Sequence, residues 1–125
     1  MLCEFPTYPT IPAADLGRAR QFYEKTLGLD AEQVSDAGVM YKSGGASLFV
    51  YPSTFAGTNK ATAAGFRVAD LSATVTELQA RGVRFEEYDM PGIKTVNGVT
   101  KTPDGDAAWF KDSEGNIIGL FTGGM

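Results

Sequence analysis

The tripeptide Ala-Asp-Leu occurs at residues 14–16 and again at residues 69–71, and each copy opens a stretch with the pattern of a helix. Each stretch follows a short strand-like segment and ends at a glycine, Gly28 in the first copy and Gly82 in the second. Further strand-like segments follow both glycines. The sequence therefore contains a duplicated strand–helix–strands unit, which narrows the fold strongly and directs attention to the junction of the two halves.

The likeness between the halves extends beyond the helices. Residues 41–45, YKSGG, lead into the strand-like residues 48–50, and residues 110–116, FKDSEGN, lead into residues 118–120. Both segments have the pattern of a strand, a turn and a second strand. The halves are therefore expected to end in equivalent hairpins.

Each predicted helix has an N-cap and an apolar face. Asp15 and Asp70 are placed to accept hydrogen bonds from the exposed amides of a first turn. Apolar residues then recur at helical spacing in both copies, as Leu16, Ala19, Phe22, Tyr23 and Leu27 in the first and as Leu71, Val75 and Leu78 in the second. Each half is therefore predicted to pack one helix against its own strands.

The chain is predicted to be a single α+β domain, residues 1–125, of two tandem βαβββ modules. Module one covers about residues 6–52, a linker about 53–61, and module two about 62–125. Strands are expected at residues 8–11, 39–42, 47–51, 62–68, 83–88, 107–111 and 117–122. Two such modules side by side form a curved mixed sheet with helices outside and a concave cavity inside.

Residues 90–106 are predicted to be a long loop. Asn97-Gly98 within it is a strong signal for a hairpin turn. A long segment of this kind is either a lid over the cavity or a surface excursion.

Composition excludes several classes of protein. The chain has 15 acidic and 11 basic residues, a net charge of -4, which argues against a nucleic-acid partner. It has no apolar run long enough to span a membrane, so no membrane partner is expected. Its one cysteine, Cys3, cannot form an internal disulfide, which favours a cytoplasmic location. The chain has no histidine, which excludes histidine-based triads and the usual zinc ligand sets.

The motifs resemble those of the vicinal oxygen chelate superfamily, the glyoxalase/bleomycin-resistance/dioxygenase proteins. The resemblance rests on IPAADL at residues 11–16, QFYEKTLGL at 21–29, FRVADL at 66–71 and AWFKDSEGNIIGL at 108–120. It covers nearly the whole chain and implies a glyoxalase-like fold. Residues 88–96, YDMPGIKTV, look like those of a bacterial subgroup of single-domain members.

The resemblance also indicates where metal-dependent members place their ligands. The four positions fall on Tyr8, Phe49, Ala63 and Gly119 in this chain. Three of these side chains have no donor atom, and one phenol does not make a divalent metal site. No metal and no cofactor are therefore expected at these positions. The alternative is a relocated site built from Glu86, Glu87 or Asp89.

If the four positions face the cavity, strand alternation turns the residues two places away toward it as well. Arg67 then becomes a candidate clamp for a carboxylate or phosphate, or else an ion-pair partner within the sheet. Aromatic side chains supply stacking surfaces. The predicted ligand-binding residues are Tyr8, Thr10, Phe49, Tyr51, Arg67, Trp109 and Phe121.

Three hypotheses of function follow. The first is a metal-free protein that binds a small organic molecule in the concave sheet, as the antibiotic-sequestering members of the superfamily do. Such members are dimers with sites shared between chains, so the resemblance implies a homodimer. The second is a lyase, isomerase or dioxygenase with a rebuilt metal or acid–base site, in which Glu86, Glu87 or Tyr8 acts as the base. The third is a regulatory or interaction subunit whose aromatic face is covered by another protein.

Overall fold

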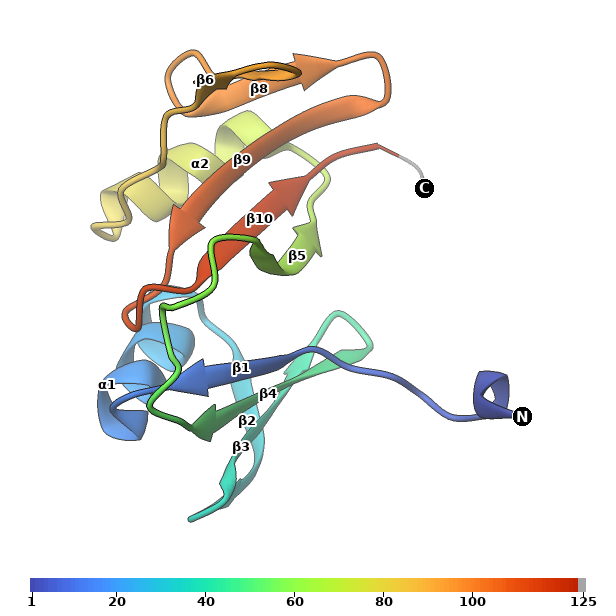
Figure 1. The fold of residues 1–125 in the computed structure, drawn as a ribbon, viewed down its shortest axis with the longest axis vertical. Helices are drawn as coiled ribbons and strands as arrows, with labels where there is room; N and C mark the ends of the chain where they lie inside the picture. Colours follow the sequence, from blue (N-terminus) through green and yellow to red (C-terminus); the bar gives the residue numbers. More distant parts are fainter. Residues whose placement is uncertain (124–125) are drawn as a thin grey trace.

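A computed structural model describes residues 1–123 of the chain (Figure 1). After a short 3-10 helix, η1 (Leu2–Glu4), module one contains β1 (Thr10–Ala13), α1 (Leu16–Arg20), the π-helix η2 (Gln21–Thr26), β2 (Asp30–Ser35), β3 (Gly38–Ser43) and β4 (Ala46–Pro52). Module two contains β5 (Thr62–Arg67), α2 (Leu71–Ala80), β6 (Asp89–Met90), β7 (Ile93–Lys94), β8 (Val99–Thr102), β9 (Gly105–Lys111) and β10 (Ile117–Phe121).

The two modules have the same strand topology. The orders are β1-β4-β3-β2 and β5-β10-β9-β8, with the first strand of each module parallel to its last and the other neighbours antiparallel. The α+β class and the duplicated module are confirmed. The sequence predicted one curved sheet, whereas the strands within residues 1–123 pair as two four-stranded sheets and one small hairpin, β6-β7. Module one lies below module two in Figure 1.

Both helices begin as predicted. Asp15 accepts a hydrogen bond from the Arg18 amide at 3.0 Å, and Asp70 accepts one from the Ala73 amide at 3.0 Å. The two caps have nearly the same backbone angles, φ -131° and ψ 103° against φ -132° and ψ 102°. The two modules are therefore alike in local backbone geometry as well as in topology.

The first helix ends differently from the second. After Arg20 it widens into η2, where the Leu27 amide donates to the Phe22 carbonyl five residues earlier at 2.9 Å. Gly28 then leaves the helix with φ +74°, as predicted. The wider turn buries Tyr23 completely and packs Phe22 against the cores of both modules.

The predicted alternation of the strands is confirmed. Leu48 and Val50 on β4 and Ile118 and Leu120 on β10 are buried beneath the helices. Each module has its own core, and four partly buried residues pack against both cores: Phe22, Leu27, Ala64 and Phe66. These shared contacts join the modules by burial of apolar surface.

The strand predicted at residues 83–88 is wrong. Within it only Phe85 forms a bridge, with Phe110, and the Glu86 amide donates to the Trp109 carbonyl at 2.8 Å. The chain then leaves the edge of β9. It pairs with that edge again further on, as strand β8, in which Val99 pairs with Ala108. The predicted strand and β8 thus share one edge of the sheet.

The loop predicted at residues 90–106 contains strands β6 to β8 instead. The Asn97-Gly98 turn within it is confirmed, since both residues have positive φ, 54° and 81°, and Val96 pairs with Val99 across them.

The turn between β9 and β10 connects module two to module one (Figure 1). The Glu114 carboxylate accepts hydrogen bonds from the Asp15 amide at 2.9 Å and from Arg18 Nε at 2.7 Å. Asp112 accepts one from the Tyr23 hydroxyl at 2.6 Å. The same turn is therefore a hairpin connection within module two and a cap on the first helix of module one.

Candidate ligand-binding cavity

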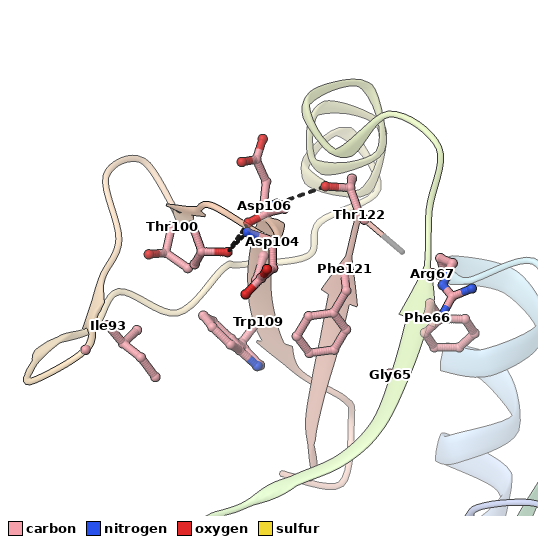
Figure 2. Close-up of a pocket in the computed structure, with 15 residues that line it drawn as sticks. Gly65, Phe66, Arg67, Ile93, Thr100, Asp104, Asp106, Trp109, Phe121 and Thr122 are labelled. Atoms are coloured by element: carbon pink, nitrogen blue, oxygen red, sulfur yellow. Dashed lines mark hydrogen bonds between the residues drawn. The ribbon is translucent and has the colours of Figure 1, made fainter. Parts of the chain in front are cut away.

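The face of module two opposite its helix contains a cavity of about 470 Å³ (Figure 2). Strands β5, β9 and β10 supply Arg67, Trp109 and Phe121. The excursion that carries β7 and β8 supplies Ile93, Thr100 and Asp104. Residues of the predicted loop thus form one wall of the cavity.

Phe121 lies over two glycines of the neighbouring backbone. A Cβ atom added at Gly65 would come within 2.8 Å of the Phe121 ring, and one added at Gly119 would come within 2.5 Å of it. Gly119 and Gly65 are register partners on β10 and β5. The absence of both side chains is therefore what allows the ring to rest flat against the sheet.

Three aromatic rings form a row across this face. The ring centroids of Tyr88 and Trp109 are 5.6 Å apart, and those of Trp109 and Phe121 are 6.0 Å apart. Both pairs are edge-to-face, at 67° and 81°, a favourable arrangement of aromatic quadrupoles. Figure 2 shows the rings of Trp109 and Phe121 next to each other on β9 and β10.

A second cavity, of about 530 Å³, lies at the other end of the same face. It shares Ile93 and Trp109 with the first cavity. The rest of its lining is linker residues and Thr62, Glu86, Tyr88, Met90, Lys111, Gly115 and Ile117. Ile93 and Trp109 therefore separate two compartments of one concave surface.

The predicted ligand-binding residues fall into two groups. Arg67, Trp109 and Phe121 line the first cavity. The other four belong to the module-one side and line none of the cavities described within residues 1–123: Tyr8, Thr10, Phe49 and Tyr51. The rings of Phe49 and Tyr51 stack at 6.0 Å and 5°, and Thr10 is the register partner of Phe49.

Sequence reasoning missed Ile93, Thr100 and Asp104. Their segment carries a signal, because it is punctuated by Gly92, by Asn97-Gly98 and by Gly105, all with positive φ. That pattern predicts turns, but it does not predict which side chains face the cavity between them.

The residues present do not fit the metal that the fold family implies. At Gly119, where the sequence resemblance places a ligand carboxylate, a side chain would meet the ring of Phe121 and Nε1 of Trp109, the latter at 3.2 Å from its Cβ. Within residues 1–123 no cluster of three or more His, Cys, Asp or Glu side chains is arranged to hold a metal ion. Of the proposed relocated ligands, Glu86 pairs with Lys111 at 3.7 Å and Glu87 accepts from the Gly98 amide at 2.7 Å.

The large pKa shifts of Glu114 and Tyr23 belong to groups that lie away from the cavity. Burial alone would raise the pKa of Glu114, but the hydrogen bonds from Arg18 and the Asp15 amide outweigh it and lower the pKa to about 2. Burial, with a further contribution from the Asp112 carboxylate, raises the pKa of Tyr23, so its hydroxyl remains a donor. These groups belong to the contact between modules. The cavity itself offers aromatic rings, an isoleucine and charged residues at its rim, which are suited to binding.

Known structures with this fold cover nearly the whole chain. UcmS2 matches at 19% identity and a TM-score of 0.74, over 94% of this chain and 96% of that one. Lactoylglutathione lyase from Agrobacterium tumefaciens matches at 17% identity and a TM-score of 0.70, over 95% and 93% of the two chains. TnmS3, an antibiotic binding protein from Streptomyces sp. CB03234, matches at 27% identity and a TM-score of 0.65, over 96% of each chain.

A comparison with curated proteins found no match. No helix within residues 1–123 combines the length and apolar composition needed to cross a membrane. The profile of the Glyoxalase/Bleomycin resistance protein/Dioxygenase superfamily matches residues 7–120. Through this match, and with the duplicated module and its sheet order, the chain belongs to that superfamily.

Proposed function

We propose that the protein binds a small organic molecule on the concave face of module two, without a metal, and holds it by contacts with aromatic side chains. The observation that carries the proposal is the ring of Phe121 over Gly65 and Gly119, which puts an aromatic surface where the family's carboxylate would stand. The cavity of about 470 Å³ lies in the usual size range of small-molecule sites. The likeness to TnmS3, described as an antibiotic binding protein, supports a sequestration or resistance role.

A homodimer is part of this proposal. The N-terminal segment extends away from both sheets in Figure 1 and exposes Leu2 and Phe5, 74% and 62% of whose surfaces are accessible. The aromatic face of module one, with Tyr8, Phe49 and Tyr51, would then cover the cavity of the partner protomer. A cytoplasmic location agrees with the exposed free thiol of Cys3. Native mass spectrometry of the protein without added metal tests the dimer and reports any bound organic molecule by its mass.

The sole tryptophan of the chain makes the binding test specific. Trp109 lines both cavities, so its fluorescence reports directly on the site. We expect members of a library of small aromatic compounds, antibiotics included, to quench or shift this emission saturably. Mass spectrometry of the recovered compound then distinguishes binding, which returns it unchanged, from catalysis, which does not.

Phe121→Ala is expected to weaken binding of a hit about tenfold, because it removes a ring from the contact surface. Phe55→Ala is the matched control, since Phe55 is 75% exposed in the linker and lines neither cavity. Equal losses in both variants, or no saturable binding by any compound, would count against the proposal. Thermal unfolding of each variant checks that it is folded.

A further inference from the structure

The two compartments of the concave face differ in charge. The first cavity is lined by Asp104, Asp106 and Arg67, but Figure 2 shows the Asp106 carboxylate turned away from the rings of Trp109 and Phe121. The second carries the ammonium groups of Lys60 and Lys111 against the carboxylate of Glu86. Asp104 and Arg67 therefore balance in the first compartment, whereas basic residues are in excess in the second.

Lys111 can bind an anion in addition to its loose ion pair with Glu86. Its Nζ atom is 3.7 Å from Glu86 Oε1, longer than a charge-assisted hydrogen bond of about 2.7–2.9 Å. The Lys111 side chain is 56% exposed, whereas that of Glu86 is 27% exposed. An ammonium group has three donors, so an incoming anion gains hydrogen bonds without displacing a tight ion pair.

The wall between the compartments is aromatic. Trp109 faces both cavities, and its edge-to-face partners Phe121 and Tyr88 stand in the first and the second cavity respectively. A flat, apolar group on this row of rings would have Asp104 near one end and Lys111 near the other. The excess of basic side chains in the second compartment attracts an anionic substituent, so such a group is directed toward that end.

We infer that the second compartment is an anion subsite and that the ligand is a small aromatic molecule with a carboxylate or sulfonate group, its ring system on the Trp109–Phe121 pair and its anion at Lys111 and Lys60. The inference rests on the proposed function and narrows its ligand to one chemical class. Lys111 is then a specificity-determining residue of the site.

Two fluorescent probes test the charge preference separately from binding. 1-Anilinonaphthalene-8-sulfonate and N-phenyl-1-naphthylamine share their aromatic body, and only the first carries a sulfonate. Energy transfer from Trp109, the sole tryptophan, reports probe binding, and its loss in Phe121→Ala but not in Phe55→Ala identifies probe bound at this site. We expect the wild-type protein to bind the sulfonate probe about fivefold more tightly than the neutral one, a preference that shrinks at high salt.

Lys111→Gln should abolish most of this preference while leaving the affinity for the neutral probe unchanged, and Lys60→Gln should reduce the preference further. Lys42→Gln is the matched control, because Lys42 occupies the equivalent place near the end of the hairpin strand β3 in module one and lines no described cavity. Glu86→Gln should strengthen binding of the sulfonate probe by freeing Lys111.

The outcomes separate the inference from the proposed function. If both probes bind with energy transfer but with equal affinity, or if Arg67→Gln removes the preference and Lys111→Gln does not, the anion subsite is wrong and the binding function stands. If neither probe transfers energy from Trp109, the proposed cavity itself is wrong.

Discussion

At the scale of single residues, two glycines decide what the concave face can hold. Gly65 and Gly119 leave a flat patch of backbone that the Phe121 ring covers, and any Cβ atom there would meet that ring at 2.8 Å or less. Contacts under 3.0 Å require the ring or the backbone to move, which in a packed environment costs about 1–3 kcal/mol. A side chain at Gly119 and the present position of the Phe121 ring therefore exclude each other.

A double-mutant cycle tests this coupling. Gly119→Ala is expected to lower the free energy of unfolding by about 1–3 kcal/mol in the wild-type background, because its Cβ collides with Phe121. In a Phe121→Ala background the same substitution should cost much less, and urea unfolding measures both values. Gly17→Ala is the control, since a Cβ there meets only Asp15 Oδ1 at an ordinary 3.4 Å. Additive effects of the two substitutions would contradict the proposed contact.

At the scale of elements, the excursion from β6 to β8 builds one wall of the cavity. It leaves the edge of β9 beyond the bridge from Phe85 to Phe110 and returns with β8 through the Asn97-Gly98 turn. A Cβ atom at Gly98 would lie 2.9 Å from the Cβ of Phe85, so this turn is packed against the core of module two. The cavity wall is thus anchored at the turn and not at the tip of the β6-β7 hairpin.

Substitution of two glycines in this segment distinguishes the cost of backbone strain from the cost of a packing clash. Gly92 and Gly98 have similar positive φ values, 86° and 81°, but a Cβ at Gly92 would meet nothing within 4 Å. Gly92→Ala should therefore show only the backbone penalty of about 1–2 kcal/mol. Gly98→Ala should lose more stability and also weaken ligand binding, because its clash with Phe85 moves β8. Equal melting temperatures of the two variants would show that the turn is not packed as described.

The elements also show what the sequence could predict. The helix caps, the strand alternation and the Asn97-Gly98 turn depend on local residue chemistry, and all three were predicted. The strand at residues 83–88 was not correctly predicted, because Val83 and Phe85 are apolar for burial in the core and only Phe85 pairs, in a single bridge with Phe110. The π-helix was missed for a similar reason, since its extra residue per turn is stabilised by the packing of Phe22 and Tyr23 and not by a local signal.

In the candidate site, too, the features set by local sequence were predicted and those set by long-range packing were not. Strand alternation identified Phe121 as a side chain of the concave face, because period two is a local property. Trp109 was predicted as a member of the aromatic lining. Ile93 and Asp104 reach the cavity only because their segment returns to the edge of β9, which is a long-range event. No local pattern in residues 90–106 encodes that return.

At the scale of the whole molecule, the turn between β9 and β10 holds the modules together through buried polar groups. Asn116 donates to the Pro12 carbonyl at 2.8 Å and accepts from the Gly57 amide at 3.2 Å. Asp112 and Glu114 receive the Tyr23 hydroxyl and the Arg18 guanidinium. Every buried side-chain nitrogen and oxygen in residues 1–123 has a hydrogen-bond partner, so this network is fully satisfied.

Glu114 makes this junction sensitive to acid. Its folded-state pKa of about 2 lies below the value of about 4.3 expected in the unfolded chain. A depressed carboxyl pKa contributes stability that is fully present above the unfolded value and is lost as the pH falls through the folded value. Because the Glu114 side chain is completely covered, the loss between about pH 4.3 and pH 2 is on the order of 3 kcal/mol.

Glu114→Gln should therefore lower stability at pH 7, where the ionised carboxylate binds Arg18, and flatten the fall in unfolding free energy between pH 4.3 and pH 2. Urea unfolding at a series of pH values measures both effects. Glu77→Gln is the control, because the Glu77 side chain is 66% exposed and its pair with Arg81 lies on the surface of α2. If the Glu114 variant keeps the acid slope of the wild-type protein, another carboxyl group controls the junction. If it loses the slope and its modules separate before either core melts, the β9–β10 turn is what fixes module one against the cavity of module two.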